Sequence, residues 1–327
     1  MKGISRGLKA IGMLAAATVL CLAHPAAAEY PERPIRLIVA FPPGGSTDLS
    51  ARSLASFLQK ELGEGVNVMV ENRPGASGEI GFTALAEAKP DGYTIGFINS
   101  PNVLTIPIER KPRFDWRAYD LLGNVIDDPG NFSVHKDSEI QPLADLVAYA
   151  KANPFKVTIG TSGVGSDDHL AVLAFQRIAG VKLTHIPFKG SADVQNAVAG
   201  RHIMVGAINI GEAMAAQAGG APVRNLGQMS VQRSDVAPDV PTFKEQGFDI
   251  VFNSLRGAAA PKGLPEPIRE RLAAAVAKVA ANPEFRAKMK ASYAPMSFLS
   301  PDAFAAALST GEDGIRTLWK ETPWVEK

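Results

Sequence analysis

Apolar and polar positions along the chain predict strands that are joined by amphipathic helices. Residues 37–41 form an apolar run of strand length, and a helical pattern follows it until Gly63. The apolar positions of this helix recur at spacings of three, four and seven: Ala51, Leu54, Ala55, Leu58 and Leu62. Glycine commonly ends a helix, because it tolerates the left-handed conformation required there. We therefore expect a strand, a loop and a helix in this order.

The same alternation continues through the rest of the chain. Further strands are predicted at residues 66–70, 94–98, 132–134, 157–159, 183–186 and 203–207. Helices are predicted over 79–88, 143–150, from about 167, and in the tail over 267–281, 283–290 and 301–319. Strands that alternate with helices indicate an α/β fold with open, mostly parallel sheets that are flanked by helices.

The N-terminal segment has the pattern of a secretory signal peptide. Lys2, Arg6 and Lys9 precede the apolar stretch 11–22, and the small residues 26–28 offer a cleavage site. This stretch is shorter than the roughly 18 residues that a membrane-spanning helix needs, and no later stretch approaches that length. We therefore expect cleavage after Ala28 and a soluble protein that is exported to the periplasm.

Composition limits what the mature protein can be. Removing 28 of the 327 residues leaves 299, which exceeds a typical single core and predicts two domains. The removed segment contains three basic residues and no acidic one, so the formal charge falls from +1 to −2. No nucleic-acid partner is expected at this charge. The only cysteine, Cys21, lies in the signal peptide behind the bulky Leu20, so we expect no lipid anchor and no disulfide.

The loop at residues 42–48, with the sequence PPGGSTD, has the composition of an anion-binding turn. Its glycines allow a close approach to a guest, and Ser46 and Thr47 stand where a helix N-cap belongs. Unpaired N–H groups would then point out of the loop. Tight strand-to-helix turns are also common in doubly wound α/β proteins, so this loop alone leaves its role open.

Several such loops should meet at one edge of the sheet. The segments 71–78 and 99–102 follow predicted strands, and residues 160–166 form a second glycine- and serine-rich loop before a helix. In open α/β sheets, ligands bind at the carboxyl ends of the strands. The candidate ligand-binding residues are Phe41, Gly45, Ser46, Thr47, Ala76, Ser77, Gly78, Thr161, Ser162, Gly165, Ser166 and Asn209.

Nucleotide chemistry is not favoured by these loops. Gly163 and Gly165 match the first two glycines of a dinucleotide fingerprint, but Asp168 stands where the third should be. A phosphate-binding P-loop needs a lysine after its last glycine, and here Ser46 follows Gly45. No cofactor is therefore expected.

An exported serine hydrolase is a second interpretation of the same residues. Ser162, Asp168 and His169 are the residue types of a catalytic triad, but no serine lies in a Gly-x-Ser-x-Gly elbow. Asp168 and His169 are adjacent and would face different sides of a helix. The five histidines include no pair at metal-ligand spacing, so no metal site is expected either.

Four residues near these loops have two open roles each. His169 and His185 could support the serine-rich loop or be buried histidines with backbone partners. Lys189 could attract a carboxylate or be a solvated turn residue. Arg256 could form an ion pair at a hinge or contact the ligand.

Eight motifs in order resemble the substrate-binding proteins of tripartite tricarboxylate transporters, also called the Bug family of solute receptors. The motifs are FPPGGSTD at 41–48, VENRPGASG at 70–78, KPDGYT at 89–94, YAKANP at 149–154, TSGVGS at 161–166, HL at 169–170, HIPFKG at 185–190 and PDVPT at 238–242. The resemblance covers essentially the whole mature chain. Arg256 departs from it, since the commoner family pattern has an apolar residue there.

The resemblance implies a bilobed, clam-shell binding protein and no enzyme. Domain 1 would comprise residues 29–127 and 253–327, and domain 2 residues 128–252. The ligand would be a small carboxylate: a di- or tricarboxylate, an amino acid or an aromatic acid. The partner would be a permease with one large and one small integral-membrane subunit, and the receptor a monomer. A receptor that feeds a signalling partner instead shares every residue discussed and stays an alternative.

Overall fold

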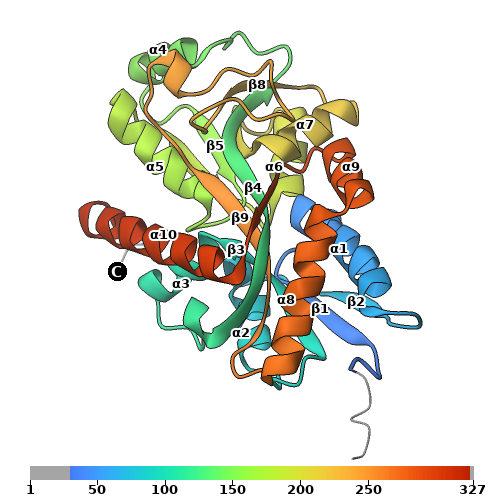
Figure 1. The fold of residues 1–327 in the computed structure, drawn as a ribbon. Helices are drawn as coiled ribbons and strands as arrows, with labels where there is room; N and C mark the ends of the chain where they lie inside the picture. Colours follow the sequence, from blue (N-terminus) through green and yellow to red (C-terminus); the bar gives the residue numbers. More distant parts are fainter. Residues whose placement is uncertain (1–29, 325–327) are drawn as a thin grey trace, which may run out of the picture.

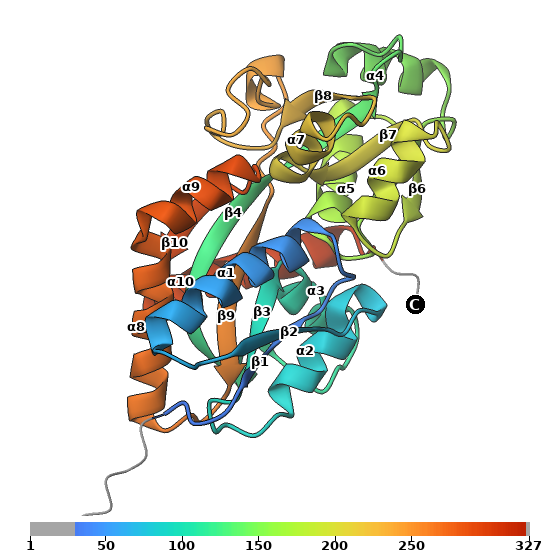
Figure 2. The same cartoon turned by 90° about the vertical axis from the view of Figure 1, so that its right-hand side faces the viewer.

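The computed structural model describes residues 30–324, and Figures 1 and 2 show it from two sides. The predicted signal peptide, with Cys21 and the cleavage site, lies outside the described residues. The strands are β1 (Ile35–Val39), β2 (Val68–Asn72), β3 (Thr94–Ser100), β4 (Tyr119–His135), β5 (Thr158–Thr161), β6 (Thr184–Pro187), β7 (Val205–Asn209), β8 (Val223–Gln228), β9 (Asn253–Pro261) and β10 (Met296–Leu299).

Ten α-helices are found in the described part of the chain. They are α1 (Ser46–Leu62), α2 (Glu79–Ala86), α3 (Asn102–Glu109), α4 (Leu143–Ala152), α5 (Asp167–Ala179), α6 (Ser191–Ala199), α7 (Ile210–Ala218), α8 (Glu266–Ala281), α9 (Pro283–Ala291) and α10 (Pro301–Glu321). Within residues 30–324, no helix is both long enough and apolar enough to cross a bilayer.

Two groups of parallel strands are joined by antiparallel strands in the middle. The strand order is β2-β1-β3-β9-β4-β7-β5-β6, with β8 and β10 also paired to β4. Strand β1 is parallel to β2 and β3, and β5 is parallel to β6 and β7. Strands β9 and β4 are antiparallel to each other and to their outer neighbours, β3 and β7. This confirms the predicted α/β class and adds an antiparallel centre to it.

Strands β4 and β9 connect the two halves of the molecule. Strand β4 pairs with β9 from Tyr119 to Pro129 and with β7 and β8 from Gly130 to His135. We call the half with β1–β3, α1–α3 and α8 the first lobe, and the half with β5–β8 and α4–α7 the second lobe (Figure 2). The predicted domain boundaries at residues 127 and 253 fall in this region and stay a prediction.

Each lobe has its own apolar core. In the first lobe, Leu54 and Leu58 of α1 belong to the same buried cluster as Val276 of α8. In the second lobe, Phe132 of β4 packs edge-to-face against Phe175 of α5 with ring centroids 5.2 Å apart. Each of these helices buries the apolar face that its sequence pattern shows. This is why the helices could be predicted from the sequence.

Some local predictions need correction. Helix α1 begins at Ser46, and its N-cap is Gly45 without a side-chain capping bond, so Ser46 and Thr47 are inside the helix. The strand expected at 132–134 is the end of the much longer β4. Helices α3, α6 and α7 were not predicted; they have only eight or nine residues, which leaves little room for a helical period.

Candidate functional site

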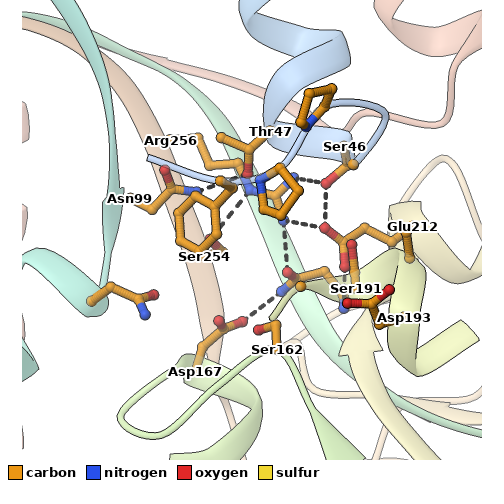
Figure 3. A pocket seen from close by; sticks show the side chains of 18 residues that line it. Ser46, Thr47, Asn99, Ser162, Asp167, Ser191, Asp193, Glu212, Ser254 and Arg256 are labelled. Atoms are coloured by element: carbon orange, nitrogen blue, oxygen red, sulfur yellow. Dashed lines mark hydrogen bonds and ion pairs between the residues drawn. The ribbon is translucent and has the colours of Figure 1, made fainter. Parts of the chain in front are cut away.

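A cavity of about 130 Å³ lies between the N-terminus of α1 and the second lobe (Figure 3). Its lining comes from both lobes and from β9. The lining residues are Phe41, Pro42, Pro43, Gly45, Ser46, Thr47, Asn99, Asn102, Ser162, Asp167, Gly190, Ser191, Ala192, Asp193, Asn209, Glu212, Ser254 and Arg256. A second cavity of about 380 Å³ adjoins it and shares Phe41, Pro42 and Ser162 with it.

The loop before α1 is held in shape by a buried carboxylate. Asp48 is 2% exposed, and its Oδ2 accepts hydrogen bonds from the Gly44 N–H at 2.9 Å and from Arg52 Nε at 3.0 Å. Its Oδ1 accepts from Asn72 Nδ2 at 2.8 Å. Burial favours the neutral acid, but these hydrogen bonds outweigh it and lower the pKa of Asp48. One N–H of the predicted anion-binding loop is therefore used by the chain itself.

Arg256 lies on β9 at the junction of the two lobes. Its Nη1 donates to Ser46 Oγ of the first lobe at 2.5 Å, and its Nη2 donates to Asn209 Oδ1 of the second lobe at 2.7 Å. Nη2 also donates to Glu212 Oε1 at 3.2 Å, and Nε to Ser254 Oγ at 3.3 Å. Figure 3 shows the guanidinium at the centre of these bonds. Both roles that the sequence left open for Arg256 fit this position, because it forms ion pairs and lines the cavity.

Glu212 joins the two lobes directly. Its Oε1 accepts a hydrogen bond from the hydroxyl of Ser46, and its Oε2 accepts from the N–H of Asn209 at 3.3 Å. Glu212 lies in the first turn of α7, three residues after Asn209. An Asn followed three residues later by Glu is a capping pattern, and this pattern could have placed Glu212 in the first turn of a helix from sequence, although not at the cavity.

Three buried aspartates lie around Arg256. Asp128 Oδ2 is 3.5 Å from Arg256 Nη2, and its Oδ1 accepts from the Gly211 N–H at 2.9 Å. Asp167 accepts from Asn209 Nδ2 at 2.6 Å. Burial raises the pKa of Asp128 to about 8 and that of Asp167 to about 6, since water is withdrawn from the charged form. Burial and the charge of Asp167 raise the pKa of Asp168 well above its usual value.

The second predicted loop uses several of its own hydroxyls. Ser166 caps α5: its Oγ accepts from the His169 N–H at 3.2 Å and donates to the Gly163 carbonyl at 2.9 Å. Thr161 Oγ1 is 2.7 Å from His185 Nε2. Thr161 and Ser166 are almost fully buried, so these hydroxyls shape the loop.

A stacked pair of histidines packs against this loop. The rings of His169 and His185 are 4.0 Å apart and nearly parallel, and His169 Nδ1 accepts from the Gly165 N–H at 3.2 Å. Burial lowers the pKa of His169 to about 3, with a smaller contribution from His185, and lowers the pKa of His185 to about 4. His169 is thus a buried histidine with a backbone partner. Because that partner is Gly165, it also stabilises the serine-rich loop.

The structure brings together only some of the predicted ligand-binding residues. The first cavity is lined by Phe41, Gly45, Ser46, Thr47, Ser162 and Asn209. The adjoining cavity is lined by Phe41, Ser162, Ala76, Ser77 and Gly78, together with Lys189. Thr161, Gly165 and Ser166 are absent from the lining of both cavities in the described chain. The cavity is also lined by polar residues that were not predicted to bind a ligand: Asn99, Asp167, Ser191, Asp193, Glu212 and Ser254. Ser191, Asp193, Glu212 and Ser254 are distant in sequence from the two loops, whereas Asp167 directly follows the second loop.

The triad residues are not arranged for hydrolysis. Ser162 Oγ is 2.5 Å from Asp168 Oδ2, while His169 contacts Gly165 and His185 instead of the serine. A serine nucleophile needs a histidine within hydrogen-bond reach as its base. Among residues 30–324, no group of three or more His, Cys, Asp or Glu side chains is placed to hold a metal ion.

Two lobes joined by crossing strands, with a polar cavity between them, define a solute-binding protein of the periplasmic type. Residues 50–300 match the family described as "Tripartite tricarboxylate transporter family receptor", and the chain belongs to this family. The family consists of solute receptors and not of enzymes.

Curated relatives agree with this assignment. The chain is 36% identical over 282 residues to the "UPF0065 protein in gbd 5'region" of Cupriavidus necator, with 84% of each chain covered. It is 34% identical over 265 residues to "Protein BugT" of Bordetella pertussis, with 80% of each covered.

Solved structures share the fold. The periplasmic binding protein BugD is 31% identical with a TM-score of 0.81, over 91% of this chain and 100% of BugD. The R. palustris protein Rpa4515, solved with adipate, is 26% identical with a TM-score of 0.83, over 89% of this chain and 97% of that protein.

Proposed function

We propose that this chain is an exported receptor that captures a small carboxylate in the cavity between its lobes. It delivers the ligand to a tripartite tricarboxylate-type permease with one large and one small membrane subunit. The lining of the cavity supports this proposal, because it combines the N-terminus of α1 with polar side chains of the second lobe. The related Rpa4515 with adipate supports a carboxylate as the ligand class.

The N-terminus of α1 is the part of the cavity best suited to a carboxylate. Helix α1 has 17 residues, and the first N–H groups of a helix have no partner within the helix. Aligned peptide dipoles place positive potential at this end. The hydroxyl of Ser46 and the guanidinium of Arg256 lie beside it, so the site has one cationic donor that the motifs alone did not require.

Location and delivery rest on the family and on the N-terminal pattern. A periplasmic receptor needs export, and residues 1–28 have the features of a cleaved signal peptide. Intact-mass measurement of protein isolated from the periplasm should give a chain that begins at Glu29 without an acyl group. An acylated Cys21 would contradict the proposed maturation.

A thermal-shift screen of the mature protein against a carboxylate library tests the function. A ligand at one hundred times its dissociation constant should add about 2.7 kcal/mol to the free energy of unfolding. We expect a clear rise in melting temperature with at least one small carboxylate and none with matched neutral amides. If no carboxylate in the library stabilises the protein, the proposed function is wrong.

A further inference from the structure

A carboxylate of the protein itself occupies the point where the proposed ligand carboxylate would bind. Glu212, in the first turn of α7, accepts a hydrogen bond from the hydroxyl of Ser46 at the N-terminus of α1. Its Oε1 also accepts from Arg256 Nη2 at 3.2 Å, and Arg256 Nη1 donates to Ser46 Oγ at 2.5 Å. Figure 3 shows these three bonds as a closed ring. A ligand carboxylate that reaches α1 therefore meets an acceptor that belongs to the chain.

Ser46 has too few donors for two carboxylates. A serine hydroxyl carries one proton, and Ser46 donates this proton to Glu212. The lone pairs of the same oxygen accept the bond from Arg256 Nη1, and they offer nothing to a carboxylate. The hydroxyl can therefore donate to Glu212 or to a ligand carboxylate, but not to both at once.

Most donors of Arg256 are also used within the protein. An arginine has five N–H donors. Nε and Nη1 each donate one to Ser254 and Ser46, and Nη2 donates to both Asn209 and Glu212. In the described part of the chain, this leaves one N–H of Nη1 for a ligand. A carboxylate that is held at two points needs two N–H donors, so it must displace an internal acceptor. Among these acceptors, Glu212 is the one with the charge of the ligand.

Glu212 has space to move away from Ser46. A further cavity of about 230 Å³ is lined by Ser46, Glu212 and Arg256, which also line the first cavity. The rest of its lining includes Leu49 of α1 and Ala215 of α7, which are exposed, so this cavity opens to solvent. A carboxylate that turns into it would be hydrated. The cost of a buried charge without a partner is thereby avoided.

We propose that Glu212 is an internal competitor of the ligand, because its carboxylate holds Ser46 and Arg256 until a ligand carboxylate displaces it. The inference rests on the proposed function and adds an autoinhibitory residue to that site. Only the arrangement in which Glu212 has left Ser46 binds the ligand, so the apparent dissociation constant is the intrinsic one divided by the population of that arrangement. This population is small, since charge-assisted hydrogen bonds hold Glu212 in place. Glu212 therefore determines the ligand concentration at which the receptor responds.

Isothermal titration of the mature protein with a carboxylate found in the thermal-shift screen tests this inference. Glu212→Gln removes the competing charge and keeps the side-chain size. If the competent arrangement makes up about one tenth of the wild type or less, Glu212→Gln should bind the ligand at least tenfold more tightly. Without ligand, this variant should melt at a lower temperature than the wild type, because the ion pair with Arg256 is lost. A residue that only stabilised the fold would not produce the gain in affinity.

Two further variants separate the contact from the charge. Glu212→Asp keeps the charge, but its side chain is one methylene shorter and does not reach Ser46 from the same backbone position. It should bind the ligand at least threefold more tightly than the wild type, and it decides the test if Glu212→Gln fails to fold. Asp193→Asn is the matched comparison: Asp193 lines the first cavity, and within residues 30–324 it has no hydrogen bond to Ser46 or Arg256. It removes the same charge and should change the affinity less than threefold.

Two results would overturn the inference. If a folded Glu212 variant binds the ligand no more tightly than the wild type, Glu212 does not compete with the ligand. If Asp193→Asn gains as much affinity as Glu212→Gln, the effect comes from the total charge of the cavity and not from the contact with Ser46. In both cases the wild type still binds a carboxylate, so the proposed function stands. A screen in which no carboxylate stabilises the protein would instead refute the proposed function, and the inference with it.

Discussion

Arg256 is a buried cation whose neighbours make its removal costly. Taking away one partner of a buried ion pair leaves the other charge uncompensated, which typically costs about 3 to 5 kcal/mol. We expect Arg256→Met to lower the free energy of unfolding by this amount in urea denaturation, because the buried Glu212 loses its cation.

The control for this prediction is a surface ion pair. Arg33 and Asp91 are 3.0 Å apart, but their side chains are 59% and 40% exposed. Exposed pairs contribute about 0 to 1 kcal/mol, so Arg33→Met should change the free energy of unfolding by less than about 1 kcal/mol. Equal effects of the two substitutions would contradict the role assigned to Arg256.

The stacked histidines predict a loss of stability in acid. The pKa values of His169 and His185 are lowered to about 3 and 4, whereas an unfolded histidine has a pKa near 6.5. The unfolded chain therefore binds more protons between these values, and the stabilising contribution of the neutral pair is lost as the pH falls from about 6.5 to 4.

A double variant isolates this contribution. The free energy of unfolding of the wild type should fall more steeply between pH 6.5 and 4.5 than that of His169→Gln/His185→Gln. Carboxyl groups titrate in both proteins, so their effect cancels in the comparison. Parallel pH profiles would show that the histidines are not held neutral by burial.

At the scale of single elements, α2 packs against the end of β1 through a glycine. A Cβ atom on Gly81 would lie 2.6 Å from Ala40 Cα and 2.9 Å from the Arg73 carbonyl oxygen, which are backbone atoms. We expect Gly81→Ala to cost about 1 to 3 kcal/mol, as overpacking usually does. Chemical denaturation measures this loss.

Gly314 in α10 is the matched control for Gly81. A Cβ atom there would meet no other atom within 4 Å. Because alanine favours helix more than glycine does, Gly314→Ala should stabilise by about 0.5 to 1 kcal/mol. If both alanine substitutions were neutral, the close contact of α2 with β1 would not exist in solution.

The periodic helices and the short parallel strands were predictable, because each buries one apolar face or one short apolar run. The full length of strand β4 could not be predicted, because Pro129 and Gly130 have the composition of a turn. In the structure, Pro129 pairs with Asn253 and Gly130 with Asn209. Partners more than 75 residues away in sequence therefore determine this strand, and no local pattern contains that information.

Of the candidate site, too, one part could be predicted from the sequence and another part could not. The loops around Ser46 and Ser162 could be found from their composition, because turns that bind ligands are rich in glycine and hydroxyl groups. Their juxtaposition with Glu212 and Asp193 depends on how the lobes meet, which sequence spacing does not reveal. The twelve predicted site residues remain a prediction until ligand binding is measured.

At the scale of the whole molecule, the two lobes are connected by the crossing strands. Asp128 pairs with Ser254 and Pro129 with Asn253, so both crossing segments lie side by side. Outside the cavity, a further bond links the lobes: Thr105 Oγ1 of α3 donates to the Gly165 carbonyl at 2.8 Å. We propose that ligand binding shifts the lobes toward this closed arrangement.

Small-angle scattering measures this movement directly. A saturating carboxylate found in the screen should decrease the radius of gyration, because each lobe supplies part of the donors and both are needed for full contact. A radius of gyration that is the same with and without the ligand would count against closure about residues 128 and 253.

We propose above that a carboxylate binds between the lobes at the N-terminus of α1. Gly45→Val tests it most directly. A Cβ atom at Gly45 makes only ordinary contacts, 3.7 Å from the Pro42 carbonyl oxygen and 3.9 Å from Ser191 Oγ, so the fold should survive. The valine methyl groups would nevertheless narrow the cavity. Lys189→Ala is the control, because Lys189 is exposed and lines only the adjoining cavity.

Isothermal titration with the carboxylate from the screen compares the wild type with these two variants, after circular dichroism has shown that each is folded. We expect Gly45→Val to weaken binding at least tenfold, which is about 1.4 kcal/mol, and Lys189→Ala to change it less than twofold. Normal binding by Gly45→Val together with lost binding by Lys189→Ala would rule out a carboxylate at the N-terminus of α1, since the ligand would then be held at Lys189.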